Sequence, residues 1–139
     1  PRGPRKSVIV LDASAGVDFL LRRGPRGDWA AAWIRRMEVV HAPHLVDLEL
    51  ISVVRKLVLV GEVSARRARE ALDDFAELMV VRYAEAPFIT RVWELRHVMT
   101  PYDATYVALA EALGVPLLTT DERLARATGH RAEIVAYGA

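Results

Sequence analysis

The chain has 139 residues, of which 53% are hydrophobic and 27% are charged. This composition excludes an intrinsically disordered chain, and the length suits one domain with a self-sufficient core. The absence of cysteine excludes disulfides and thiolate metal sites and fits a cytoplasmic protein, while a formal net charge of only +1 excludes nucleic-acid binding through a general excess of positive charge.

The ends and the charged surface give three further expectations. No run of about 18 uninterrupted apolar residues is present, so no membrane span is predicted. Residues 1–6 are basic with no apolar signal core after them, and we expect a flexible leader before a single domain over residues 7–139. Local arginine groups are candidates for phosphate contacts, although most are expected to be solvated helix faces: Arg22, Arg23 and Arg26; Arg66, Arg67 and Arg69; Arg123 and Arg126.

A first strand is predicted at residues 7–11, a β-branched apolar run that ends at Asp12. The chain then becomes helical over residues 13–23. Asp12 can act as a helix cap, or as a functional acid at the carboxyl end of a strand. Ser14, two residues later, can hold a carboxylate or a metal-bound water, but taken alone it is an ordinary helix-start serine.

Residues 24–27 predict a loop before a helix at residues 29–37. Trp29 and Trp33 stand four positions apart on that helix, which is the spacing of packing residues rather than of a base-stacking platform. A second strand is predicted at residues 38–41, and Ala42-Pro43 is expected to end it.

The most apolar helix is predicted at residues 44–60, where apolar side chains cover nearly the whole helical wheel and Glu49, Ser52 and Lys56 form a narrow polar stripe on one side. Such a helix is either buried on most faces or carries an oligomer or partner interface. The stripe can face water or an internal polar cleft, and the sequence leaves both open. Asp47 lies elsewhere on the helical wheel and is expected to be an ordinary surface acid.

Ser64 is predicted to cap a helix at residues 65–79, whose alternating charges suit a salt-bridged exterior. A third strand follows at residues 80–83, and then an amphipathic helix at residues 87–98 with Phe88, Val92 and Leu95 inward. The histidines have no metal-ligand spacing and are expected to be structural or surface residues: His41, His44, His97 and His130.

Residues 100–124 form a complete helix–strand–helix unit. Its first helix contains Asp103 and ends at Gly114, a buried strand is predicted at residues 117–119, and Asp121 begins the next helix. The simplest interpretation of either acid is a helix-start residue stabilised by the helix dipole. A last strand is predicted at residues 133–137.

About five short strands thus alternate with helices, which predicts an α/β fold with a mostly parallel sheet between two helical layers. Strands in such a sheet share one carboxyl rim, where Asp12 and Asp121 can meet, and Asp103 and Glu49 can point at the same place. Several neighbouring carboxylates need a cation to stay ionised, and an oxygen-only ligand set favours Mg²⁺ or Mn²⁺. Such a cluster suits phosphodiester hydrolysis by a metal-activated water.

Three segments, in this order and over essentially the whole chain, carry a resemblance: VIVLDASA, HLVDLELISVVRKL and PYDATYVALAEALGVPLLTTDERL. The chain resembles the PIN-domain ribonucleases and, more narrowly, the VapC toxins of bacterial toxin–antitoxin operons. The resemblance implies a Rossmann-like sheet, a Mg²⁺- or Mn²⁺-dependent endoribonuclease, an RNA substrate, a small antitoxin that covers the cleft, and a homodimer. It assigns metal binding to Asp12, Glu49, Asp103 and Asp121, and accessory hydroxyls to Ser14 and Thr119.

Three alternatives stand beside this interpretation. The chain can act mainly as the binding component of an antitoxin–operator repressor complex. A phosphatase of the haloacid dehalogenase type expects an Asp where Ser14 stands and a later lysine, whereas the sequence has only Lys6 and Lys56. A response-regulator receiver domain also lacks its expected lysine.

Overall fold

The computed structural model describes residues 8–21 and 23–138, so the predictions for the leader, for Ser7 and for Arg22 lie outside the described residues. The helices are α1 (Ala13–Leu21), α2 (Gly24–Ile34), α3 (Val46–Leu59), α4 (Ala65–Glu77), α5 (Ile89–Glu94), α6 (Pro101–Leu113) and α7 (Glu122–Arg126). The strands are β1 (Val10–Leu11), β2 (Val40–Pro43), β3 (Val80–Tyr83), β4 (Leu117–Thr119) and β5 (Ile134–Ala136). A 3₁₀ turn at Ala86–Phe88 precedes α5.

The five strands form one sheet in the order β3-β2-β1-β4-β5, and every neighbouring pair is parallel. This confirms the predicted parallel sheet. The central strand is β1, in which Val10 pairs with His41 of β2 on one side and with Leu117 of β4 on the other. The ends of β1 and β4 are therefore adjacent, as the expected meeting of Asp12 and Asp121 requires.

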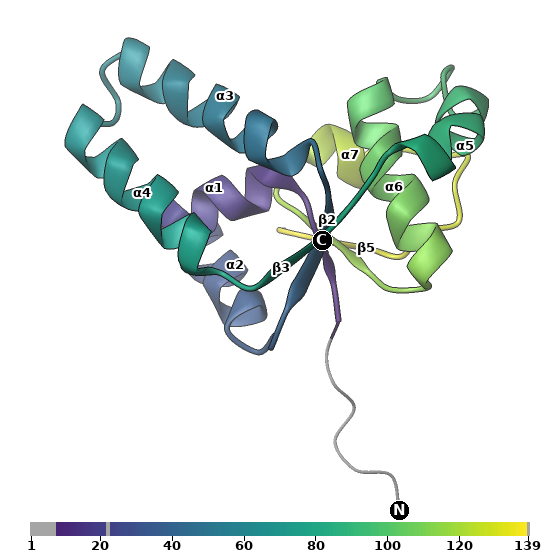
Figure 1. The fold of residues 1–139 in the computed structure, drawn as a ribbon, viewed down its shortest axis with the longest axis horizontal. Helices are drawn as coiled ribbons and strands as arrows, with labels where there is room; N and C mark the ends of the chain where they lie inside the picture. Colours follow the sequence, from purple (N-terminus) through teal and green to yellow (C-terminus); the bar gives the residue numbers. More distant parts are fainter. Residues whose placement is uncertain (1–7, 22, 139) are drawn as a thin grey trace, which may run out of the picture.

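Helices cover both faces of the sheet (Figure 1). Helices α1 to α4 lie on one side and pack on one another, with α1 touching α2, α3 and α4. Helices α5 and α6 lie on the other side, where α6 packs against β1, β2 and β4. The predicted three-layer α/β/α architecture is confirmed.

Helix α6 shows how the local sequence fixes one of these elements. The Thr100 hydroxyl accepts a hydrogen bond from the Asp103 backbone N–H at 3.2 Å and so caps the first turn. Gly114 ends the helix in the left-handed conformation, with φ +67°, which favours glycine. Between these caps, seven consecutive residues from Ala104 to Ala110 are buried, because α6 lies between the sheet and α5.

Three predicted boundaries were wrong. Residues 24–27 are the first turn of α2 rather than a loop, because Pro25 occupies the first turn, where its missing N–H costs nothing. Strand β2 is shifted to Val40–Pro43, and Pro43 pairs with Tyr83 at its end instead of stopping it earlier. The helix expected at residues 87–98 is limited to α5 and its preceding 3₁₀ turn.

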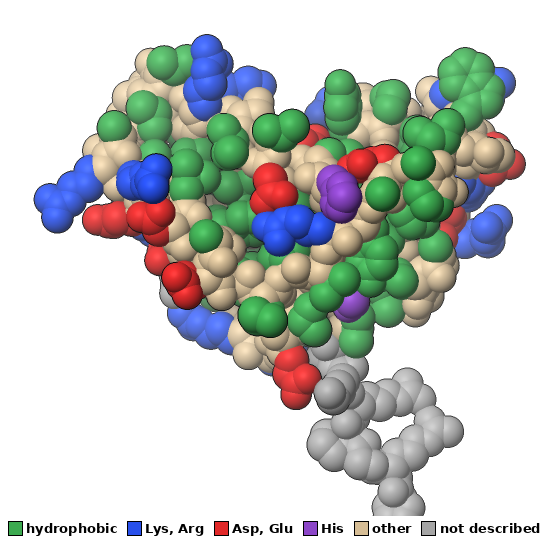
Figure 2. All heavy atoms as spheres, viewed as in Figure 1, with side chains coloured by type: hydrophobic (Ala, Val, Ile, Leu, Met, Phe, Trp, Pro, Cys, Tyr) green, Lys and Arg blue, Asp and Glu red, His purple; other side chains and the backbone are tan. Residues whose placement is uncertain are grey.

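Helix α3 is not buried on most faces. Only Val46, Leu50 and Val54 are buried, whereas Leu48 is 73% exposed and Ile51 and Leu59 are also exposed. The first of the two alternatives is therefore wrong for this helix, and the oligomer or partner interface stays a prediction. Figure 2 shows hydrophobic side chains over this part of the surface. Within the described residues, none of the helices is long and apolar enough to cross a lipid bilayer.

Candidate active site

Asp12 follows β1 directly and is held by two hydroxyl groups. Its Oδ2 atom accepts hydrogen bonds from Ser14 Oγ at 2.5 Å and from Thr119 Oγ1 at 2.8 Å. Thr119 Oγ1 also accepts from the Asp121 backbone N–H at 3.0 Å, and Ser14 Oγ accepts from the Thr120 N–H at 3.2 Å. The ends of β1 and β4 are thus joined by side-chain bonds, and the two predicted accessory hydroxyls both bond to Asp12.

Burial raises the pKa of Asp12 to about 6, although the Ser14 and Thr119 hydroxyls oppose the shift. The negative charges of Asp103 and Glu49 add to the rise. A carboxylate that is only 6% exposed and repelled by two others gains strongly from a nearby cation.

Glu49 comes from α3. The polar stripe predicted on that helix, Glu49, Ser52 and Lys56, lines a cleft that Asp12 also lines. Burial raises the pKa of the Glu49 carboxyl, Tyr106 lowers it and Asp103 raises it. The question that the sequence left open is answered in favour of the internal cleft.

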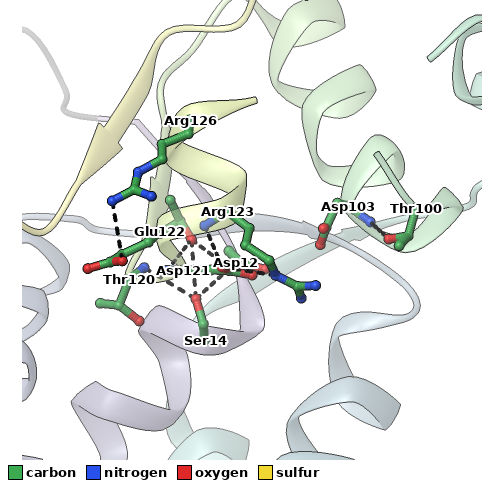
Figure 3. Close-up of polar contacts among 10 residues, drawn as sticks. Asp12, Ser14, Thr100, Asp103, Thr120, Asp121, Glu122, Arg123 and Arg126 are labelled. Atoms are coloured by element: carbon green, nitrogen blue, oxygen red, sulfur yellow. Dashed lines mark hydrogen bonds and ion pairs between the residues drawn. The ribbon is translucent and has the colours of Figure 1, made fainter. Parts of the chain in front are cut away.

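Asp103 and Asp121 come from the starts of two different helices. Asp121 caps α7, with its Oδ1 atom accepting from the Arg123 N–H at 2.9 Å, so the helix-cap interpretation is correct for it and does not exclude a place in the cleft. Burial raises the pKa of Asp103, and the charge of Asp121 raises it further, while Arg123 and Thr100 lower it. Figure 3 shows Arg123 extending from α7 toward Asp103.

These side chains line one cleft of about 700 Å³, called the acidic cleft below. Its acidic members include the four predicted metal-binding residues, and its basic members are Arg23, Arg26, Lys56 and Arg123. Figure 2 shows the surface hollowed between the α3 side and the α6 side of the molecule. The cleft combines carboxylates that attract a cation with cations that attract phosphate.

The donor set of the acidic cleft fits a hard divalent cation. Its predicted ligands Asp12, Glu49, Asp103 and Asp121 are all carboxylates, and neither histidine nor cysteine lines the cleft. The raised pKa of Asp12, Glu49 and Asp103 reflects burial and mutual repulsion, which such a cation relieves. Within residues 8–21 and 23–138, however, no three metal-ligating side chains are already close enough to hold an ion together.

Several other predicted residues lie outside the acidic cleft. Asp47 forms a two-bond ion pair with Arg82, at 2.7 and 2.8 Å, and is absent from the lining, as expected. Of the described arginines in the predicted groups, Arg23, Arg26 and Arg123 line the cleft. The others have structural contacts: Arg66 with Glu70, Arg69 with Asp73, Arg126 with Glu122, and Arg67 with Glu70 and the Leu20 carbonyl oxygen.

The sequence interpretation missed Tyr106. This residue is fully buried on α6, and its hydroxyl lies near Glu49 and Asp12. In the sequence it was indistinguishable from a core aromatic. The available signal was its position three residues after Asp103, which places both side chains on one helix face.

Comparison with known proteins agrees with the fold described above. The PIN domain family matches residues 9–129. The chain is similar to ribonuclease VapC12 of Mycobacterium tuberculosis, with 45% identity over 129 residues that cover 91% of this chain and 97% of the relative. Among solved structures, PAE2754 from Pyrobaculum aerophilum superposes with a TM-score of 0.67 and 25% identity, covering 96% and 88% of the two chains. VapC20 of M. tuberculosis, a sarcin-ricin loop cleaving toxin, superposes with a TM-score of 0.66 and 20% identity, covering 90% and 97%.

Proposed function

This chain belongs to the PIN domain family and, within it, to the VapC ribonucleases, and we propose that the acidic cleft is where it hydrolyses RNA. The chain is an endoribonuclease toxin of a toxin–antitoxin pair. This family excludes the haloacid dehalogenase and receiver-domain alternatives. The observation that carries the proposal is the convergence on one cleft of four carboxylates from four separate parts of the chain.

The carboxylates have distinct roles in this proposal. Asp12, Asp103 and Asp121 hold a divalent cation, Mg²⁺ or Mn²⁺, while Glu49 holds a second ion or orients the attacking water. When bound, such a cation supplies Lewis-acid stabilisation of the phosphoryl group and a nucleophile at neutral pH. Ser14 and Thr119 orient Asp12 through its Oδ2 atom, which leaves Oδ1 free of their hydrogen bonds and able to serve as a ligand.

The basic side chains of the cleft bind the RNA backbone. Arg23, Arg26, Lys56 and Arg123 stand among or beside the carboxylates and offset their repulsion of phosphate. Arg23 also forms an exposed ion pair with Glu62 at 3.3 Å, and a phosphate can displace so weak a partner. Four basic side chains along one cleft suit a chain of phosphates better than a single small anion.

A small cognate antitoxin is the proposed inhibitor. It covers the acidic cleft and directs a cationic side chain at the carboxylates, whose mutual repulsion rewards any positive charge placed between them. We place this pair in the cytoplasm, where RNA is available.

The experiment is cleavage of a structured RNA pool by the purified protein with Mg²⁺ or Mn²⁺, beside an EDTA control and the Asp12→Asn variant. We expect discrete cuts that disappear in both controls. Asp47→Asn is the matched control, because it removes an equal charge from an acid outside the cleft, and it should cleave like the wild type. Absence of cleavage by folded, antitoxin-free, metal-loaded protein would overturn the proposal and favour the antitoxin–operator binding role.

A further inference from the structure

The side chain of Tyr106 is fully buried, yet its hydroxyl group has no hydrogen-bond partner among the described residues. No other buried side-chain nitrogen or oxygen in the described part of the chain is left in this way. Leaving a buried hydroxyl unpaired costs free energy, and native proteins rarely do so without a reason. The position of this hydroxyl supplies one.

Tyr106 lies outside the lining of the acidic cleft, next to two residues that line it, Asp12 and Glu49. It lies one helical turn after Asp103 on α6, but unlike Asp103 it does not line the cleft. Burial raises the pKa of its hydroxyl, the charges of Asp12 and Glu49 raise it further, and the Ala13 backbone lowers it. The hydroxyl in turn lowers the pKa of Glu49. It therefore stands beside the Glu49 carboxylate, although the geometry falls short of a hydrogen bond.

We propose that Tyr106 is a positioning residue for Glu49: its hydroxyl donates a hydrogen bond to the Glu49 carboxylate when that carboxylate turns to hold a divalent cation. This inference rests on the proposed function of the acidic cleft. The buried hydroxyl gains its missing partner in the loaded state only, so the gain adds to the affinity for the cation. Groups that orient metal-binding side chains in this way typically change metal affinity by about 10–100-fold.

A tyrosine hydroxyl that merely supported the fold would behave differently. It would already be bonded without metal, as the Tyr83 hydroxyl is to His41 Nδ1 at 2.7 Å. Removing a bonded hydroxyl destabilises the protein, whereas removing an unpaired one costs little or even stabilises it. The two roles are therefore distinguished by comparing metal affinity with the stability of the metal-free protein.

The test uses the full chain as wild type and as Tyr106→Phe. Mn²⁺ affinity is measured by isothermal titration calorimetry, and Tm is measured in EDTA. We expect Tyr106→Phe to weaken Mn²⁺ binding by about tenfold or more, with a Tm in EDTA equal to or above that of the wild type. Tyr83→Phe is the matched control, because it removes a bonded tyrosine hydroxyl outside the cleft; it should lower Tm and leave Mn²⁺ affinity unchanged.

A second comparison places Tyr106→Phe in a Glu49→Ala background. If Tyr106 acts through Glu49, the added substitution has no further effect on Mn²⁺ affinity. Wild-type affinity in Tyr106→Phe, or an equal loss in both backgrounds, would overturn the inference while leaving the proposed function intact. A wild-type protein that neither binds Mn²⁺ nor cleaves RNA would overturn both.

Discussion

Asp12 sets the strongest expectation at the scale of single residues. Its folded-state pKa of about 6 lies above the ordinary value of 3.8, so ionising it costs folding free energy. The contribution of protonated Asp12 to the free energy of unfolding is complete below about pH 4. It is lost as the pH rises through 6, and the loss is roughly 3 kcal/mol in total. Asp12→Asn removes this dependence, and the metal-free variant should be more stable than the wild type at pH 8 but not at pH 4.5.

Urea denaturation in EDTA between pH 4.5 and 8 measures this difference, because the titrating groups that are not coupled to Asp12 contribute equally in the two proteins. Asp47→Asn serves as the control, since its partner is the half-exposed Arg82 and exposed pairs contribute about 0–1 kcal/mol. A constant difference between wild type and Asp12→Asn across this pH range would contradict the expectation.

Thr119 is the residue that links Asp12 to Asp121. Thr119→Val removes the hydroxyl that donates to Asp12 Oδ2, and a hydrogen bond to the charged form lowers a carboxyl pKa. We therefore expect the pKa of Asp12 to rise above its wild-type value, as measured by a carbon NMR titration of the carboxyl group in EDTA. Thr119→Ser keeps the hydroxyl, and an equal shift in both variants would show that the hydrogen bond is not the cause.

At the scale of elements, two glycines give opposite expectations. Gly114 ends α6 at φ +67°, and a side chain in that conformation costs about 1–2 kcal/mol, so Gly114→Ala should destabilise the protein. Gly16 lies inside α1, where an added Cβ would meet Leu50 at 3.5 Å and Leu11 at 3.7 Å, which is ordinary contact. Gly16→Ala should be neutral or stabilise by up to about 1 kcal/mol. Denaturant titrations measure the change in the free energy of unfolding for both variants. A change of the same sign in both would contradict the expectation.

The elements also show how much of the fold and the site the sequence predicts. Asp12 and Asp121 were placed correctly because each follows an apolar strand, and parallel strands share a rim. The orientation of Glu49 was not predictable, because it depends on how α3 docks against the rest of the molecule. The start of α2 was misread because Gly24-Pro25 also occurs in loops, and only packing against α1 decides between the two.

The role of the Tyr106 hydroxyl could not be predicted from the sequence, for a related reason. Its meaning depends on an absent hydrogen bond, and a missing contact has no signature in a sequence pattern. Ser14 was a candidate from its position two residues after Asp12, and Thr119 came from the family resemblance alone. The hydrogen bonds of both hydroxyls to Asp12 could be seen only in the structure.

At the scale of the whole molecule, divalent cations should stabilise the fold. A cation that binds only the folded protein stabilises it by roughly 3 kcal/mol when its free concentration is about a hundredfold above Kd. We expect Mn²⁺ and Mg²⁺ to raise the Tm of the wild type in a concentration-dependent way, and Asp103→Asn to weaken the effect. Ca²⁺-free buffers of matched ionic strength ensure that a rise in Tm does not come from general screening of charges by salt. A Tm that is independent of both ions would contradict the proposed site.

The homodimer remains a prediction. The apolar side chains exposed on α3, including Leu48, Ile51 and Leu59, are a surface that a second copy can cover. Sedimentation equilibrium of the antitoxin-free protein should give twice the chain mass of 15.5 kDa, with Leu48→Ser weakening the association. A monomer at all concentrations would refute it.

The bond between Thr119 and Asp12 joins residues that are 107 positions apart. Because β4 pairs with the central strand β1 but lies far behind it in the sequence, the site cannot close until the β4 segment has been synthesised. Nascent and prematurely ended chains therefore lack the second half of the nuclease. The site of the toxin is therefore complete only in molecules in which β4 has been synthesised and has paired with β1.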